Sequence, residues 1–263
     1  MIKIGLIGFG AIGQCVIATL PKALTEEYQV VGILTRKNID NLVNDISSYT
    51  NIDQLLAQHP DIIVECAGHD AVKEYGCKIL AANISLVISS IGALADSHLY
   101  EQLKHASTNS QAKIYLPAGA IGGIDALVAA KLGGLNEVTY TMRKPPKAWL
   151  GTVAEALVDL NGLQQAEVIF SGSAGEAATL YPKNTNVTAT IALAGLGFEE
   201  TKVQLIADPE IEDNIHEIWV SGETGSFTIV LAGKPSSYNP KTSALTAFSV
   251  TNCVANFGSS III

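Results

Sequence analysis

Three features are scarce or absent in this 263-residue sequence. There are only four cysteines, none of them at Cys-x-x-Cys spacing: Cys15, Cys66, Cys77 and Cys253. A chain of this length does not depend on disulfides, so a reduced, cytoplasmic compartment fits best. No apolar stretch reaches the roughly 20 residues that span a bilayer. Met1 runs directly into a predicted strand, and no signal peptide is visible.

Positive charge is also scarce. The chain has 16 basic against 25 acidic residues and a formal net charge of -9. A surface of that sign repels phosphate backbones, so nucleic acid is not expected as a partner, although a local basic pocket for a small anion remains open. The histidines, cysteines and acids show no metal-ligand spacing. The composition therefore favours a small-molecule ligand and no metal.

The sequence has enough apolar residues, 48% of the chain, to build a buried core. Short apolar runs alternate with helical patterns from residue 1 to about 120, which predicts an α/β fold with a doubly wound parallel sheet. We expect one helix to end at Pro21 and another to have Asp70 as its N-cap. The expected strands are 2–7, 29–34, 61–65, 86–88 and 113–116, and the expected helices are 11–20, 52–57, 70–82 and 97–106.

The pattern changes after residue 120, where closely spaced strands predict an antiparallel or mixed sheet. This divides the chain into a first domain, 1–120, and a second α+β domain, 121–263. A last helix, 242–255, is a candidate for packing back on the first domain. The expected strands are 137–142, 167–170, 202–207, 215–221 and 226–231, and the expected helices are 123–132, 176–180 and 187–194.

The strongest motif is a glycine turn, Gly8, Gly10 and Gly13, that follows the first strand and opens the first helix. In a Rossmann dinucleotide-binding domain, Gly8 permits the tight turn, Gly10 admits the pyrophosphate and Gly13 packs the helix close to the strand. Ala11 and Ile12 complete the turn, whose free amides face the pyrophosphate. The alternative is a structural turn with no dinucleotide.

The end of the second strand bears on the choice of cofactor. An NAD site usually has Asp or Glu there, but this strand ends in Leu34, Thr35, Arg36 and Lys37. Arg36 and Lys37 can neutralise a 2′-phosphate, and Thr35 can donate a hydrogen bond to it. We therefore expect NAD or NADP, with NADP somewhat favoured. The alternative is a pair of solvated surface charges.

Four further segments resemble the L-aspartate dehydrogenase family, in order and over nearly the whole chain. They are Gly-Ala-Ile-Gly-Gly-Ile-Asp (119–125), Tyr-Pro-Lys-Asn-Thr-Asn-Val (181–187), Asn-Ile-His-Glu-Ile (214–218) and Asn-Pro-Lys-Thr-Ser (239–243). The resemblance implies oxidation of L-aspartate by NAD or NADP to iminosuccinate, which yields oxaloacetate and ammonia or feeds NAD biosynthesis. It also implies a catalytic second domain that supports a homodimer, and an active site between the domains.

By motif match, Ala120 and Asn186 fall at the family's cofactor-contacting positions, and His216 falls at its catalytic histidine. Histidine suits this role because its ordinary pKa of about 6.5 allows proton exchange near neutrality. The other four histidines lie in a predicted loop, at a helix start or on a polar helix. Without the motif, a lone histidine such as His216 would more often be a satisfied core residue.

The residues that hold the two substrate carboxylates are less determined. Lys183 and Asn184 precede a predicted helix, where free amides favour anions, and Thr242 can add a hydrogen bond. Arg143, Lys144 and Lys241 are the other cations near motifs. Any of these can instead be a solvated or capping residue. Ser173 to Glu176 has capping-box spacing and is expected to start a helix.

Several other functions remain possible or are disfavoured by missing residues. Sugar-type oxidoreductases carry Glu-Lys-Pro where this chain has Ser89, Ser90 and Ile91. The paired histidines of dihydrodipicolinate reductases are not found, and residues 117–125 lack a nucleophilic cysteine. A non-catalytic dinucleotide-binding sensor, or a dehydrogenase for another small amino or hydroxy acid, stays open.

Overall fold

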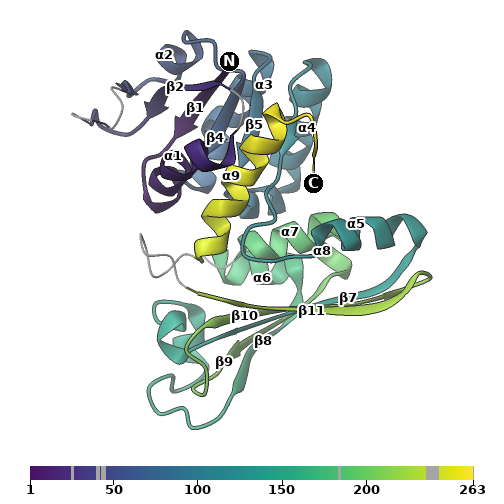
Figure 1. The fold of residues 1–263 in the computed structure, drawn as a ribbon. Helices are drawn as coiled ribbons and strands as arrows, with labels where there is room; N and C mark the ends of the chain where they lie inside the picture. Colours follow the sequence, from purple (N-terminus) through teal and green to yellow (C-terminus); the bar gives the residue numbers. More distant parts are fainter. Residues whose placement is uncertain (25–26, 40–41, 43–45, 183–184, 235–242, 263) are drawn as a thin grey trace. The chain divides into compact units, whose positions relative to one another are not determined.

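The computed structural model describes residues 1–24, 27–39, 42, 46–182, 185–234 and 243–262. The chain forms two compact units, shown in Figure 1. Unit 1 consists of Met1–Pro117 together with Thr246–Ile263, and unit 2 consists of Ala118–Leu245. Within the described ranges, no helix has both the length and the apolarity needed to cross a membrane. Each unit has its own apolar core and is described in turn.

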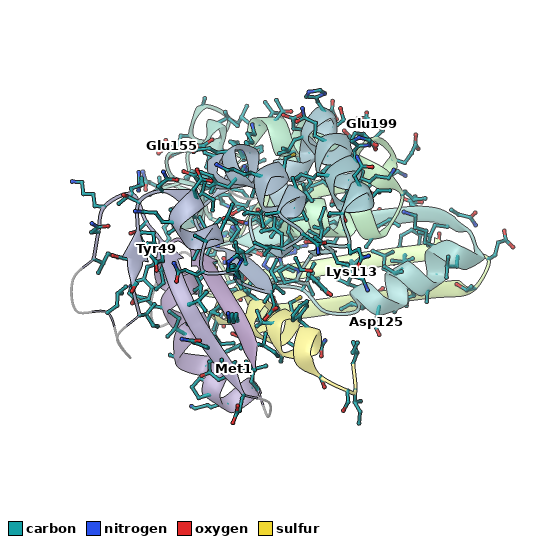
Figure 2. All side chains as sticks on the ribbon, turned by 90° about the horizontal axis from the view of Figure 1, so that it is seen from above. Met1, Tyr49, Lys113, Asp125, Glu155 and Glu199 are labelled. Carbon is teal, nitrogen blue, oxygen red and sulfur yellow. The ribbon has the colours of Figure 1, made fainter. Side chains whose placement is uncertain are left out.

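Unit 1 contains a six-stranded parallel sheet in the order β3-β2-β1-β4-β5-β6, which confirms the doubly wound α/β prediction. Near-continuous apolar runs form its central strands because both faces are buried. Tyr49 of β3, labelled in Figure 2, lies where a Cβ on Gly32 would meet its ring. The strands are β1 (Ile2–Ile7), β2 (Tyr28–Leu34), β3 (Ser48–Tyr49), β4 (Ile62–Glu65), β5 (Ser85–Ile88) and β6 (Ile114–Tyr115).

Helices cover both faces of this sheet. On one face, α1 and α9 pack with Ile4 and Leu6 of β1 in a buried apolar cluster. On the other, α3 and α4 meet where Leu103 lies against Gly76 and Leu86. The helices of unit 1 are α1 (Ala11–Ala23), α2 (Ile52–Leu56), α3 (His69–Ala81), η2 (Ile91–Ala95), α4 (Ser97–Asn109) and most of α9 (Ala244–Gly258).

The two helix ends that the sequence analysis assigned to particular residues, Pro21 and Asp70, are wrong. Helix α1 continues through Pro21 to Ala23, because a proline in the last turn removes only one backbone donor near the helix end. Helix α3 begins at His69, with Gly68 as its N-cap, so Asp70 lies inside the first turn. Gly68 has a φ of 119°, a conformation that glycine adopts readily and that lets the chain turn into the helix one residue earlier.

Unit 2 contains a mixed five-stranded sheet in the order β11-β10-β7-β9-β8. β7 and β9 are parallel, and the other neighbours are antiparallel. Figure 1 shows α5 to α8 along one face of this sheet. The elements are α5 (Ile124–Gly133), β7 (Leu135–Lys144), η3 (Pro146–Trp149), η4 (Val153–Ala156), β8 (Glu167–Ser173), α6 (Ala174–Leu180), α7 (Asn186–Ala194), α8 (Gly197–Glu200), β9 (Lys202–Ala207), β10 (Asn214–Gly222) and β11 (Gly225–Gly233).

The predicted capping box at Ser173 is confirmed. The Ser173 hydroxyl accepts from the Glu176 amide at 3.2 Å, and the Glu176 carboxylate accepts from the Ser173 amide at 2.8 Å. These two bonds satisfy backbone donors at the start of α6 that have no partner within the helix. Both residues are therefore structural, as their spacing indicates.

The C-terminal helix α9 belongs to unit 1 from Thr246 onward. Val250 and Val254 are fully buried in the same cluster as Ile4 and Leu6. The hydroxyls of Thr19 on α1 and Thr251 on α9 lie 2.8 Å apart, and the Phe257 ring meets Tyr115 edge-on at 5.9 Å. The core of unit 1 is thus built from residues near both ends of the described chain.

The carboxyl ends of β4 and β5 are joined by one buried carboxylate. Glu65, 1% exposed, accepts hydrogen bonds from the amides of Ala67 and Gly68 at 2.7 and 2.8 Å. It also accepts from the amide and the hydroxyl of Ser90, at 3.0 and 2.9 Å. Four bonds to one carboxylate offset much of the cost of burying its charge. Glu65 therefore fixes the loops that follow both strands.

We expect Glu65→Ala to lower the free energy of unfolding by about 2–4 kcal/mol, because it leaves the backbone amides of Ala67, Gly68 and Ser90 without their acceptor. Urea denaturation measures this change. Glu101→Ala is the control: that side chain is 66% exposed, and the expected effect is within about 0.5 kcal/mol. A Glu65→Ala variant as stable as the wild type would show that the Glu65 hydrogen bonds do not stabilise the two loops.

Candidate active site

The glycine turn of unit 1 has the geometry that a pyrophosphate requires. Gly8 has a φ of 90°, and a Cβ there would lie 2.8 Å from the carbonyl oxygen of Cys66. A Cβ on Gly13 would lie 2.5 Å from the carbonyl oxygen of Gly8, so α1 packs directly on the turn. A Cβ on Gly10 would meet no protein atom within 4 Å. Gly10 is thus not needed for internal packing, and the space beside it is open to a ligand.

A cavity of about 680 Å³ opens beside this turn within unit 1. Its lining includes Gly8 and Gly10 of the turn, Thr35 and Arg36 after β2, and Ala67 after β4. Turn, strand ends and cavity lie at the carboxyl edge of a parallel sheet, where ligands of open α/β folds bind. The residues present therefore fit a dinucleotide. Ala11, Ile12 and Gly13 are the first three residues of α1 and directly follow Gly10, which lines the cavity.

The structure refines the expectation about cofactor choice. Arg36 is exposed and is the one base among the described residues that line the cavity. The Thr35 hydroxyl donates to the carbonyl of Lys37 at 2.7 Å, so it must rotate before it can donate to a phosphate. Asp70 and Glu74 of α3 also line the cavity. The cavity therefore has two carboxylates from α3, although the residues at the end of β2 include no Asp or Glu.

His216 lies on β10 in unit 2 and is 4% exposed. It is the one buried residue among the five histidines, all of which the structure describes. Its Nδ1 lies 2.7 Å from the hydroxyl of Tyr140 on β7, and the two rings are parallel with centroids 6.1 Å apart. Tyr140 is fully buried, and burial raises the pKa of its phenol. A neutral phenol thus fixes the imidazole and leaves Nε2 for another partner.

The environment of His216 keeps the imidazole neutral. Burial, and then the ammonium of Lys144, lower the pKa of His216 to about 4. A neutral imidazole with one nitrogen held by Tyr140 can accept or donate a proton at the other. His216 therefore has the geometry of a general base rather than that of a cation in an ion pair.

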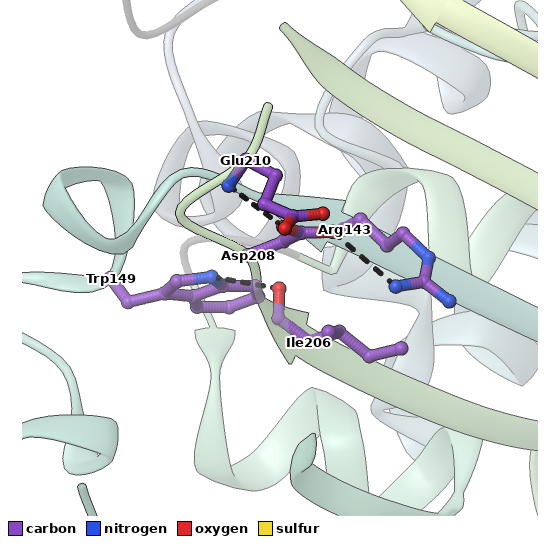
Figure 3. A network of polar contacts seen from close by, with 5 residues as sticks. All are labelled: Arg143, Trp149, Ile206, Asp208 and Glu210. Atoms are coloured by element: carbon purple, nitrogen blue, oxygen red, sulfur yellow. Dashed lines mark hydrogen bonds and ion pairs between the residues drawn. The ribbon is translucent and has the colours of Figure 1, made fainter. Parts of the chain in front are cut away.

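Arg143 and Lys144, neighbours in sequence, lie on opposite faces of β7. Figure 3 shows the Arg143 guanidinium donating to Asp208 at 3.4 Å, while the other carboxylate oxygen of Asp208 accepts from the Glu210 amide at 3.0 Å. Lys144 shares the face of Tyr140 and His216, because His216 pairs with Met142 and side chains alternate along the strand. The structure thus separates two cations that the sequence left equivalent.

The remaining expected site residues are distributed over unit 2. Ala120 is buried in the core of that unit, between Gly119 and Ile121. Asn186 is exposed and begins α7. The expected substrate residues Lys183, Asn184 and Thr242 lie outside the described residues, as does Lys241. The structure therefore brings His216 together with Tyr140 and Lys144, which the sequence did not pair with it.

Glu65, which fixes two loops of unit 1, and Tyr140, which holds His216, were not singled out from the sequence. Glu65 could have been noticed as a single acid that ends the apolar run Ile62–Val64. Tyr140 gave no signal, because it lies 76 residues from His216 and meets it only through the register of β7 and β10. Among the described residues, no group of three or more histidines, cysteines and acids is arranged to hold a metal.

Comparison with known families matches both halves of the chain. The family described as "Aspartate dehydrogenase, C-terminal" matches residues 125–257. The family described as "Homoserine dehydrogenase, NAD binding domain" matches residues 8–117. The first match contains the Tyr140–His216 pair, and the second contains the glycine turn and, apart from Ile7, the described residues that line the cavity.

Individual relatives cover nearly the full length. The L-aspartate dehydrogenase of Pseudomonas aeruginosa is 45% identical over 266 residues, covering 99% of each chain. That of Ralstonia nicotianae is 44% identical over 262 residues, covering 97% of each. The aspartate dehydrogenase structure from Thermotoga maritima has a TM-score of 0.81 at 30% identity and covers 100% of this chain and 99% of its own. A homoserine dehydrogenase in complex with NADPH, at 13% identity and a TM-score of 0.62, shares the fold.

Proposed function

Since the chain belongs to the aspartate dehydrogenase family, we propose that it oxidises L-aspartate to iminosuccinate with a nicotinamide dinucleotide. The observation that carries the proposal is the buried His216, held by Tyr140, in the half of the chain that matches the family's C-terminal domain. The relatives that match nearly the whole chain are L-aspartate dehydrogenases.

The dinucleotide would be held by the glycine turn. Gly8 and Gly13 shape the turn, Gly10 leaves room for the pyrophosphate, and the amides at the start of α1, including those of Ala11 and Ile12, face it. By family resemblance, Ala120 and Asn186 contact the same cofactor. When bound, the nicotinamide accepts a hydride from the α-carbon of the substrate.

His216 handles the protons of the reaction. Its Nε2 takes a proton from the substrate ammonium, because the amine must be neutral before the α-carbon gives up a hydride. This role requires the tautomer in which Nδ1–H donates to the Tyr140 oxygen and Nε2 carries the lone pair. Once the imidazolium has released that proton to solvent, the neutral imidazole takes a proton from the water that attacks the imine, and the adduct breaks down to oxaloacetate and ammonia.

The imine has a second possible fate, since iminosuccinate that is not hydrolysed can feed quinolinate and so NAD biosynthesis. We place the reaction in the cytoplasm, where reduced thiols are the rule. All four cysteines are free in the structure, which suits that compartment.

We expect His216→Ala to lower kcat for L-aspartate by about 10²–10⁴-fold, because general acid–base catalysis is lost. The assay follows L-aspartate-dependent reduction of NAD and of NADP, with dinucleotide affinity measured separately and expected to stay near normal. His98→Ala is the control, because His98 is exposed on α4. Turnover by His216→Ala at the wild-type rate would refute the catalytic role.

The same assay on the wild type tests the function itself. Tight dinucleotide binding without turnover of any small amino or hydroxy acid would favour a non-catalytic sensor. Faster turnover of a different amino or hydroxy acid would assign the chain to that substrate instead.

For the cofactor, we propose a preference for NADP over NAD that depends on Arg36. Its guanidinium reaches the cavity near the end of β2, where a 2′-phosphate would lie. Arg36→Ala should raise KM for NADP by about tenfold, the loss expected for one charge-assisted hydrogen bond. KM for NAD should stay unchanged. Lys22→Ala, at an exposed lysine in the last turn of α1, is the control. Equal effects of Arg36→Ala on both cofactors would refute the phosphate role.

We also propose that the protein is a homodimer that pairs through the sheet of unit 2. The face opposite His216 carries Trp219, Val230 and Val168, which are 37%, 60% and 50% exposed. Exposed apolar groups on a single sheet face are typical of a self-complementary interface.

Trp219→Glu should convert this dimer to monomers, because it places a charge among the apolar side chains of that face. Light scattering after size-exclusion chromatography measures the mass. Leu132→Glu is a matched control, since Leu132 is 89% exposed near the end of α5. A wild-type monomer, or a Trp219→Glu variant that remains dimeric, would contradict this interface.

A further inference from the structure

The hydroxyl of Ser243 is buried in unit 2. Ser243 is 8% exposed, and within the part of the chain that the structure describes its Oγ has no hydrogen-bond partner. Buried polar groups of native proteins nearly always have a partner, because an unpaired group keeps the full cost of leaving water. The Ser243 hydroxyl therefore indicates a partner from outside the described chain.

Helix capping does not account for this hydroxyl. Ser243 directly precedes α9, which begins at Ala244, and a serine in this position usually accepts a hydrogen bond from an amide of the first turn. The Ser243 hydroxyl makes no such bond to the described amides of α9. The Ala244 amide instead donates to the carbonyl of Lys234 at 3.1 Å. That backbone bond fixes the start of α9 beside the end of β11 without using the Ser243 side chain.

The Ser243 hydroxyl lies over the sheet face that carries His216. A Cβ on Gly233 of β11 would lie 3.2 Å from the Ser243 Oγ. Gly233 is opposite Asn214 on β10, and Leu231, two residues earlier, is opposite His216. Since alternate residues share a face, Gly233 and His216 face the same way, and as diagonal neighbours their Cβ positions are about 7 Å apart. A short dicarboxylate can therefore reach both the imidazole and the hydroxyl.

This face changes from apolar to polar toward Ser243. Its residues in that order are Val220, Ile218, His216 and Asn214 on β10 and Phe227, Ile229, Leu231 and Gly233 on β11. The φ of Gly233 lies outside the left-handed region, so the backbone does not require glycine there. The missing side chain instead allows the Ser243 hydroxyl to lie close against the strand, at the polar end of the row that contains His216.

We propose that the Ser243 hydroxyl donates a hydrogen bond to one carboxylate of the dicarboxylate substrate beside His216. This rests on the proposed function, in which Nε2 of His216 takes a proton from the substrate ammonium. The polar groups of L-aspartate that remain are its two carboxylates, and a hydrogen bond to a carboxylate is strong because the acceptor is charged. The substrate thereby supplies the partner that the described part of the chain does not give this buried hydroxyl.

Ser243→Ala tests the proposal through ligand affinity and stability together. Succinate is the probe, because it carries two carboxylates and no amine, and calorimetry measures its dissociation constant with saturating oxidised cofactor. We expect succinate binding to weaken about tenfold, the loss of one hydrogen bond to a charged group, and KM for L-aspartate to rise in parallel. The melting temperature should stay equal to that of the wild type or rise, because the variant removes a buried hydroxyl without a partner among the described residues.

Thr201→Val is the matched control. Thr201 is fully buried, and its Oγ1 also has no hydrogen-bond partner among the described residues. The next residue, Lys202, pairs with Thr139 of β7, whereas His216 pairs with Met142, so Thr201 lies farther along the sheet. Removing its hydroxyl should leave succinate affinity unchanged.

Gly233→Ala is an independent variant. Alanine can adopt the backbone conformation at this position, and its methyl group would lie 3.2 Å from the present position of the Ser243 Oγ. The methyl group should push the hydroxyl away from the strand. We therefore expect Gly233→Ala to weaken succinate binding as well, by less than Ser243→Ala does.

A Ser243→Ala variant that binds succinate with unchanged affinity would overturn the proposal and assign the hydroxyl to a structural water. A variant that melts below the wild type would overturn it too, because the hydroxyl then has a structural role. If the wild type oxidises L-aspartate and Ser243→Ala keeps the same KM, the proposal fails and the proposed function survives. A wild type that binds succinate through Ser243 but oxidises no L-aspartate refutes the proposed function and leaves the carboxylate site standing.

Discussion

The loops at the carboxyl edge of the unit 1 sheet depend on the four hydrogen bonds that the Glu65 carboxylate accepts. A buried charge is tolerated only when its lone pairs are used, and Glu65 uses them on backbone and hydroxyl donors from two loops. The bonds to Ala67 and Gly68 fix the chain where it leaves β4, and Gly8 packs closely against that segment. The shape of the glycine turn is therefore set partly from outside the turn.

Much of unit 1 could be predicted because its signals are local. The glycine turn, its strand and its helix occupy consecutive residues, and steric rules assign each glycine a role. Elements defined by tertiary pairing were harder to find: β3 has two residues, Ser48 and Tyr49, and exists as a strand because it pairs with β2. The helix ends at Pro21 and His69 also depended on backbone geometry that composition does not reveal.

In unit 2 the candidate site follows from strand register, which a single sequence does not specify. The family motif identified His216, but the Tyr140 contact arises because β7 and β10 pair in one particular alignment. A shift of one residue would place Arg143 rather than Lys144 on the histidine's face. The adjacent cations therefore have different partners: Arg143 meets Asp208, and Lys144 lies over Trp149.

Because α9 contributes to the core of unit 1, that core can be completed only after α9 has been synthesised. Ile4 and Leu6 emerge from the ribosome first, but Val250 and Val254, which share their cluster, are made about 250 residues later. Unit 2 is continuous in sequence from Ala118 to Leu245 and can complete its core while translation continues. Part of the apolar sheet of unit 1 therefore stays uncovered until α9 has been synthesised.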